Sequence, residues 1–166
     1  MTTPVNDRAF MLSLWNGSHG DVMRFATERS QLVASMMLEI AHVVAKRSHC
    51  ARANVGAVVT DAECLQILGF GYNGQPRGLP NQCLSPDAGL CGCVHAELNA
   101  LLKAPGALSG KLLFSTHAPC INCARAIANA GIARVHYVTP YRTTAGLDVL
   151  EAAGIEYFAF LPLTDP

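Results

Sequence analysis

Residues 95–131 read HAELNALLKAPGALSGKLLFSTHAPCINCARAIANAG and encode a helix, a strand and a second helix. The first helix is predicted to begin near His95 and to end before Pro105, because proline terminates helices. A strand is predicted over residues 111–116. Proline then starts a second helix over residues 120–130, which a glycine stops. This order of elements decides the fold class of the chain.

The same alternation of strands and helices continues on both sides of this segment. Further strands are predicted over residues 55–60, 65–70, 134–139 and 155–160, and further helices over residues 22–47 and 144–153. Strands that alternate with helices indicate an α/β protein, here a three-layer α/β/α sandwich. No linker or internal repeat is visible, so we expect residues 34–166 to form a single domain and residues 1–33 an N-terminal extension.

Composition narrows the function classes. The 166 residues are 51% apolar and only 14% charged, and this low charge predicts that other subunits cover part of the surface of a homo-oligomer. The net charge is zero. A nucleic-acid enzyme usually carries a basic excess, so we expect a small substrate and no nucleic-acid partner.

The expected location of the protein in the cell bears on the role of its cysteines. The sequence contains no apolar run of 18 residues, so no transmembrane helix is predicted. No signal peptide is recognised either, and we therefore expect a cytoplasmic protein without a membrane partner. The chain has seven cysteines, an odd number. In a reducing compartment they favour metal ligation over a disulfide framework.

Two short motifs form a candidate metal site. His95 together with Cys120 and Cys123 offers one imidazole and two thiolates, which suit zinc and leave a fourth position for water. Glu97 follows His95 by two residues and is a candidate general acid and base beside that water. A Cys-x-x-Cys pair alone is also typical of structural zinc or redox sites, but such sites have no use for Glu97.

These motifs carry a family resemblance. The pattern H-x-E followed by P-C-x-x-C is similar to that of zinc-dependent nucleobase deaminases. Residues 37–160 resemble the deoxycytidylate (dCMP) deaminase branch of the cytidine deaminase superfamily. VGAVV at 55–59 looks like its first strand, GYNGQPRGLP at 71–80 its nucleotide-binding loop, and HAELNA at 95–100 its first metal motif. The resemblance implies a cytidine deaminase-like fold with a mixed five-stranded sheet.

The resemblance also implies an activity. It predicts zinc-dependent hydrolytic deamination of dCMP to dUMP and ammonia, which supplies thymidylate synthesis. Zinc-bound hydroxide is expected to attack carbon 4 of cytosine. Glu97 is expected to move the proton of the water to ring nitrogen 3 and then to protonate the leaving amine.

Four further residues are candidate substrate contacts by the same resemblance. Asn73 is expected to bind the deoxyribose, the backbone of Ala96 to hold the base, and Tyr141 to stack on or close over the base. Arg77 is a candidate for the phosphate, because guanidinium binds phosphate bidentately. The alternatives remain open: Asn73 as a turn residue, Tyr141 as a packing residue and Arg77 as a solvated loop charge.

Some family members hold a second zinc with cysteines upstream of the histidine motif. The resemblance suggests a structural all-thiolate site here, built from Cys50, Cys83, Cys91 and Cys93. Free buried thiols are the alternative. His49 is a further candidate ligand, whereas Cys64 is predicted to lie in a strand and to have no metal role.

The resemblance also implies nucleotide effectors and an oligomer, and other activities remain as alternatives. Family members are activated by dCTP and inhibited by dTTP at the loop of residues 71–74 in a hexamer, so both effectors and a homo-oligomer from dimer to hexamer are candidates. The rival functions are a tRNA adenosine deaminase, a deaminase of free bases or nucleosides, and a zinc-stabilised binding module. The loop at 71–80 places dCMP first among these substrates.

Overall fold

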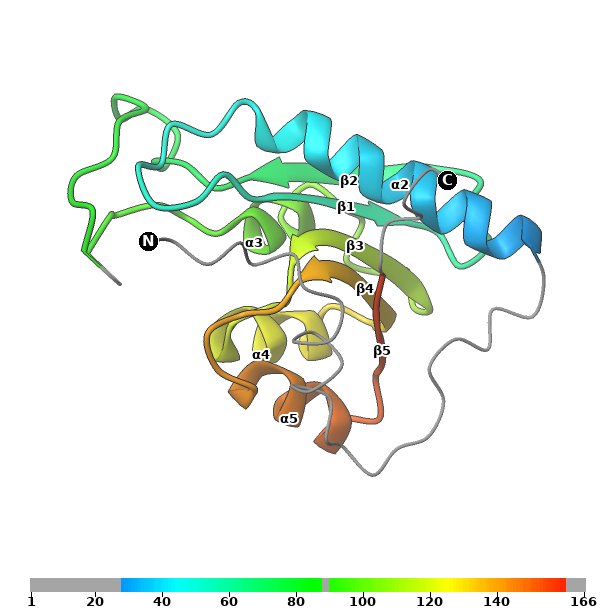
Figure 1. Ribbon diagram of the computed structural model, residues 1–166. Helices are drawn as coiled ribbons and strands as arrows, with labels where there is room; N and C mark the ends of the chain where they lie inside the picture. The colour runs from blue at the N-terminus through cyan, green and yellow to red at the C-terminus, as the bar shows by residue number, and fades with distance from the viewer. Residues whose placement is uncertain (1–27, 88–89, 161–166) are drawn as a thin grey trace, which may run out of the picture.

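The computed structural model describes residues 28–87 and 90–160 (Figure 1). Each helix and strand predicted from the sequence has a counterpart in it. In chain order the elements are α2 (Glu28–Ala45), β1 (Gly56–Thr60), β2 (Ile67–Tyr72), α3 (Ala96–Leu101), β3 (Lys111–His117), α4 (Ile121–Asn129), β4 (Ile132–Thr139), α5 (Ala145–Ala152) and β5 (Glu156–Ala159).

The five strands form one mixed sheet in the order β2-β1-β3-β4-β5. Strand β1 pairs antiparallel with both β2 and β3, whereas β3, β4 and β5 run parallel to one another. Parallel neighbours require a crossover, and α4 and α5 provide the two crossovers. The predicted mixed five-stranded sheet is therefore confirmed.

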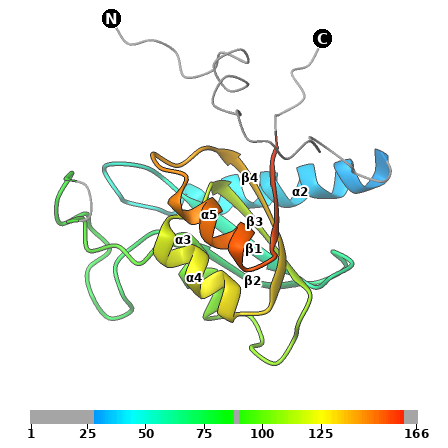
Figure 2. The ribbon, with the colours of Figure 1, turned by 90° about the horizontal axis from the view of Figure 1, so that it is seen from below.

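Helices cover both faces of the sheet (Figures 1 and 2). Of the described helices, α2 covers one face, where Met37 and Leu38 pack with Val58 and Phe114 in a buried cluster. Helices α3, α4 and α5 lie on the other face. Their cluster is larger and includes Ala57, Ala96, Leu113, Ala124, Ile127, Val135 and Leu150. Alternate residues of each strand thus enter opposite clusters, and the three-layer prediction is confirmed.

Two glycines allow helices to approach the sheet closely. A Cβ atom at Gly56 in β1 would lie 2.0 Å from the carbonyl oxygen of Ala41 in α2. A Cβ atom at Gly71 in β2 would lie 2.4 Å from the carbonyl oxygen of Ala96 in α3. No side chain fits at such distances, so glycine sets the spacing between helix and sheet. The Gly71 contact fixes the first turn of α3 above β2.

The turn between β1 and β2 is longer than predicted. Asp61 Oδ1 accepts hydrogen bonds from the backbone N–H groups of Leu65 at 2.7 Å and Gln66 at 3.1 Å, which delays the start of β2 to Ile67. Cys64 lies in this turn with a φ of 56°. The prediction that Cys64 lies in a strand is therefore wrong, because the side chain of Asp61 organises the backbone around it.

The predicted N-terminal extension falls mostly outside the described residues. Residues 1–27 are among those that the structure does not describe, together with the first residues of the helix predicted over 22–47. From Glu28 onward the chain is helical, so α2 runs through the predicted domain boundary at residue 33. Within the described residues, no helix is both long and apolar enough to cross a membrane.

Candidate metal centre and active site

Three predicted metal ligands, His95, Cys120 and Cys123, meet on the face of the sheet that α3, α4 and α5 cover. We call these three residues the histidine group. His95 is the N-cap residue of α3 and Cys120 that of α4, so both motifs stand at helix starts, as predicted. His95 Nδ1 lies 3.4 Å from Cys120 Sγ and 3.3 Å from Cys123 Sγ. All three donor atoms lie within 4.8 Å of one another.

The geometry of the histidine group fits zinc. With Zn–S bonds of about 2.3 Å and Zn–N bonds of about 2.0–2.1 Å, neighbouring ligands of a tetrahedral zinc lie about 3.5–3.6 Å apart. The observed N–S distances of 3.3 and 3.4 Å are close to that value. Three protein donors leave the fourth tetrahedral position open, as in catalytic zinc sites.

The protonation of the two thiols also indicates a cation site. Hydrogen bonds from the Cys123 thiol and, after it, from His95 lower the pKa of Cys120 to about 3, even though burial opposes ionisation. The pKa of Cys123 is raised, because this thiol donates to Cys120 and is buried. Without a cation only one of the two thiols ionises. A divalent metal ion stabilises both thiolates.

Glu97 lies in the first turn of α3 and is 3% exposed. Burial raises the pKa of its carboxyl group to about 6, while the positive charge of His95 acts in the opposite direction. A buried carboxyl group with a pKa this close to neutrality can both accept and donate a proton at physiological pH. Its place beside the histidine group is the one that the sequence predicts for a proton shuttle.

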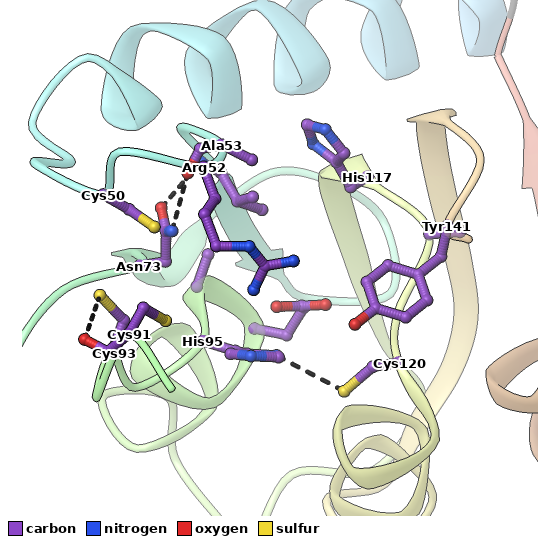
Figure 3. A pocket seen from close by; sticks show the side chains of 14 residues that line it. Cys50, Arg52, Ala53, Asn73, Cys91, Cys93, His95, His117, Cys120 and Tyr141 are labelled. Carbon is purple, nitrogen blue, oxygen red and sulfur yellow. Dashed lines mark hydrogen bonds between the residues drawn. The ribbon is translucent and has the colours of Figure 1, made fainter. Parts of the chain in front are cut away.

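A cavity of about 170 Å³ opens above these residues (Figure 3). It is lined by Cys50, Arg52, Ala53, Val55, Asn73, Cys91, Cys93, His95, Ala96, Glu97, His117, Ala118, Cys120 and Tyr141. The hydroxyl end of Tyr141 points into the cavity toward Cys120, and the guanidinium group of Arg142 lies 5.3 Å from the centre of the Tyr141 ring. Ala96 is the first residue of α3, so its N–H has no acceptor within the helix.

Of the other predicted substrate contacts, the structure brings Asn73 to the cavity and leaves Arg77 outside it. Asn73 is 7% exposed and uses both ends of its side-chain amide on the backbone: Oδ1 accepts from the N–H of Val55 at 2.8 Å, and Nδ2 donates to the carbonyl of Ala53 at 2.9 Å. Asn73 therefore anchors the segment before β1. Arg77 is exposed on the loop after β2 and does not line the cavity.

A second cluster, which we call the cysteine group, consists of Cys50, Cys91 and Cys93. Its three Sγ atoms lie within 4.8 Å of one another. Although burial acts to raise the pKa of Cys50, backbone N–H groups of Ala53 and Arg52 lower it below its ordinary value. Burial and hydrogen bonding with Cys91 raise the pKa of Cys93 to about 12. Thiols that share protons in this way again favour the binding of a metal cation.

Two other predicted donors lie outside the cysteine group. The thiol of Cys83 contributes to the lowered pKa of Cys50, but it donates to the carbonyl oxygen of Ser85 at 3.1 Å and is not within 4.8 Å of all three other thiols. The segment that carries Cys83 is irregular, so neighbouring strands do not fix its thiol. His49 is exposed and also lies outside the group.

Comparison with known proteins identifies the family. Residues 33–139 match the family model described as the cytidine and deoxycytidylate deaminase zinc-binding region. The chain belongs to this deaminase family. The sequence resemblance is thereby confirmed, and so is zinc as the metal of the domain.

Individual deaminases are similar over most of the chain. The deoxycytidylate deaminase of Schizosaccharomyces pombe is 35% identical over 145 residues, which cover 77% of this chain and 44% of the yeast protein. That of Mycobacterium phage D29 is 39% identical over 116 residues, covering 60% of this chain and 89% of the phage protein. The chain spans less than half the length of the yeast relatives that it matches.

A solved structure is similar in both fold and sequence. The dCMP deaminase from the cyanophage S-TIM5, in complex with dCMP and dUMP, gives a TM-score of 0.70 at 35% identity. The match covers 78% of this chain and 97% of the cyanophage protein. The cytidine deaminase-like fold of this chain is therefore confirmed.

Two polar residues that line the cavity were not among the predicted site residues. Arg52 reaches the cavity from the irregular segment before β1, and His117 reaches it from the end of β3. His117 Nδ1 lies 3.0 Å from Thr116 Oγ1, and burial lowers the pKa of its imidazole. The only available signal for His117 was its place three residues before Cys120. For Arg52 it was its place two residues after Cys50.

Proposed function

We propose that this deaminase is a zinc-dependent dCMP deaminase that converts dCMP and water to dUMP and ammonia. The observation that carries the proposal is the joint placement of the histidine group and Glu97 in one cavity. The similarity to a cyanophage dCMP deaminase along 97% of that protein supports the choice of substrate. The segment 71–80, which ends β2 and is exposed from Pro76 onward, supports it as well, because it resembles a nucleotide-binding loop.

The ligand assignment follows from the donor set. His95, Cys120 and Cys123 would hold the zinc ion. When bound there, zinc polarises a water molecule and lowers the pKa of that water to about 7. Two helix starts, which packing against the sheet keeps rigid, hold the three donors in place.

Glu97 moves the proton during the reaction. Its carboxylate accepts a proton from the attacking water as the water oxygen bonds to carbon 4 of cytosine. It passes that proton to ring nitrogen 3. Glu97 then takes the second proton of that water from the oxygen now bonded to carbon 4 and gives it to the exocyclic amino group. The bond between carbon 4 and the amino nitrogen breaks, the carbonyl of the product forms, and ammonia leaves. Burial suits Glu97 to this task, because it raises the pKa of the carboxyl group to about 6.

Three further residues orient the substrate. The N–H of Ala96, which has no acceptor within α3, is suited to donate a hydrogen bond to a carbonyl oxygen of the base, and Tyr141 closes the cavity over the base. Asn73 acts on the deoxyribose from the cavity wall, and its amide also holds the backbone of residues 53–55. The enclosed volume is small beside the roughly 300–1,000 Å³ of sites for drug-sized ligands, which suits one base.

The cysteine group holds a second, structural zinc ion in this proposal, with Cys83 as the fourth ligand. An all-thiolate site is typical of structural zinc. Metal-binding thiols must stay reduced, which agrees with a cytoplasmic location. The cysteine group links the segment before β1 to the segment before α3, and so supports two walls of the cavity.

A homo-oligomer regulated by dCTP and dTTP belongs to the same proposal. Large apolar side chains are exposed on α2 and β2, among them Leu32, Met36, Val43, Ile67 and Phe70. A surface of this kind favours contact with other copies of the chain, from dimer to hexamer. The zero net charge favours a nucleotide over a nucleic acid as partner.

The decisive experiment measures ammonia release by zinc-loaded protein from dCMP, deoxycytidine, CMP, dCTP, cytosine and guanine. Turnover of dCMP far above the others is the expected result. Preference for a nucleoside or a free base would keep the zinc chemistry and overturn the substrate assignment. Absence of turnover for the whole panel, repeated with dCTP present as an activator, would overturn the proposed activity.

A further inference from the structure

Arg52 is an arginine in the cavity to which the reaction assigns no task. Figure 3 shows its side chain extending into the cavity from the segment that also carries Cys50 and Ala53. Among the described residues that line the cavity, it is the sole arginine or lysine. Its guanidinium group forms no ion pair with a carboxylate in the described part of the chain. The donors of this guanidinium are therefore available to a ligand.

The backbone around Arg52 is held on both sides. On one side, the backbone N–H groups of Arg52 and Ala53 interact with the thiol of Cys50. On the other side, Asn73 accepts from the N–H of Val55 at 2.8 Å and donates to the carbonyl of Ala53 at 2.9 Å. These contacts fix the backbone from which the exposed side chain of Arg52 extends toward the cavity. A fixed backbone reduces the entropy that is lost when the side chain binds a ligand.

A nucleotide in this cavity brings a negative charge that needs a partner. The base must reach Glu97 and the histidine group, so the 5′-phosphate must lie away from these residues. A guanidinium group binds phosphate through two parallel, charge-assisted hydrogen bonds, which gives both affinity and orientation. The other arginine considered for this task, Arg77, is exposed and lies outside the cavity lining.

We propose that Arg52 binds the 5′-phosphate of the substrate and so selects nucleoside monophosphates over nucleosides. This inference rests on the proposed deamination of dCMP for the identity of the ligand. It assigns the phosphate to Arg52 and removes that role from Arg77. Asn73 then has a second effect on the substrate, because it positions the segment that carries Arg52.

The test compares Arg52→Ala and Arg52→Lys with the matched control Arg77→Ala, all loaded with zinc and checked for metal content. We expect Arg52→Ala to lower kcat/KM for dCMP by about 10- to 100-fold, the range for hydrogen bonds to a charged group. Its kcat/KM for deoxycytidine should change by less than about threefold. Arg52→Lys should retain part of the preference for dCMP, and Arg77→Ala should retain all of it. Equal losses for both substrates in Arg52→Ala, or loss of the preference in Arg77→Ala, would overturn the assignment.

Equilibrium binding separates this inference from the proposed function. The affinities of dUMP and deoxyuridine are measured for the wild-type protein and for Arg52→Ala, without any turnover. If the wild-type protein releases no ammonia from dCMP, the proposed function fails, but binding still decides the role of Arg52. A loss of tenfold or more for dUMP alone supports that role. An unchanged affinity for dUMP, or an equal loss for deoxyuridine, contradicts it.

Discussion

The histidine group, through His95 and Cys120, lines the same cavity as the cysteine group, but the two groups are built differently. The histidine group takes its donors from the starts of two helices that pack against the sheet, and Glu97 lies beside it. The cysteine group takes its donors from irregular segments before β1 and before α3. Its three donors are all thiols. The two groups therefore differ both in the kind of donor and in the elements that carry the donors.

The comparison shows what separates a reactive zinc site from a structural one. A reactive site needs an open coordination position, a nearby proton carrier and rigid support, and the histidine group has all three. A structural site needs four closed ligands and can connect loops that have few other contacts. The two groups are also coupled, because Cys93 and His95 are separated by one residue.

Removal of the proton carrier beside the histidine group should lower the reaction rate strongly and leave the cysteine group unaffected. Glu97→Gln keeps the shape of the side chain but cannot accept a proton, so we expect kcat to fall by about 1,000-fold or more. Both zinc ions should remain bound. Ammonia release and metal analysis measure the two effects, and Glu63→Gln in the exposed turn before β2 is the matched control. A normal rate in Glu97→Gln would disprove its role as proton shuttle.

Removal of one donor from the histidine group should abolish activity through the metal. We expect Cys120→Ser to lose one zinc ion per chain and all measurable turnover, because a hydroxyl group is a much poorer zinc ligand than a thiolate. Metal analysis by mass spectrometry checks the stoichiometry. Cys64→Ser removes a thiol outside both groups and should keep both zinc ions. Unchanged metal content in Cys120→Ser would contradict the ligand assignment.

The corresponding change in the cysteine group should affect stability more than chemistry. We expect Cys91→Ser to lose the other zinc ion and to lower Tm by about 5–10 °C, since a metal present at 100 times its Kd stabilises the fold by about 2.7 kcal/mol. Calorimetry and metal analysis are the measurements. Activity should fall less than in Cys120→Ser. If the zinc content and Tm both equal those of the wild-type protein, the cysteine group has no metal role.

Substitution of Cys83 should have the smallest effect, and it tests whether this thiol is the fourth zinc ligand of the cysteine group. Its thiol lies near Cys50 but outside the group of three, so we expect Cys83→Ser to weaken zinc binding by about tenfold without loss of the ion at saturating metal. Competition with a zinc chelator measures this affinity. An affinity identical to that of the wild-type protein would show that the group binds zinc with three cysteines and an exogenous ligand.

Sequence patterns were sufficient where the relevant contacts are local. Cys120 and Cys123 lie within one helical turn, and Glu97 follows His95 by two residues, so each motif is local. The joining of the two motifs into one cluster was predicted from the deaminase-like pattern that they form together. The five strands were predicted because their apolar runs are interrupted by glycine, proline and polar turns. The resemblance predicted a mixed five-stranded sheet, but the order of the strands was seen only in the structure.

Patterns were insufficient where tertiary contacts decide the direction of a side chain. Arg52 and Arg77 both lie in irregular segments, and nothing in their neighbours distinguishes them. Arg52 reaches the cavity because Asn73, some 20 residues later, holds the adjoining backbone. The turn at Cys64 was missed for a related reason, because the side chain of Asp61 reorganises the backbone four and five residues further on.

Gly71 has a consequence for reading the sequences of other chains with this fold. A Cβ atom at this position would lie 2.4 Å from the carbonyl oxygen of Ala96, the residue directly before Glu97. Any larger residue must raise the start of α3 by roughly 1 Å, a displacement that can cost an enzyme about 100-fold in rate. A homologue that keeps every metal ligand but has lost this glycine is therefore a candidate pseudoenzyme, recognisable from one position outside the cavity lining.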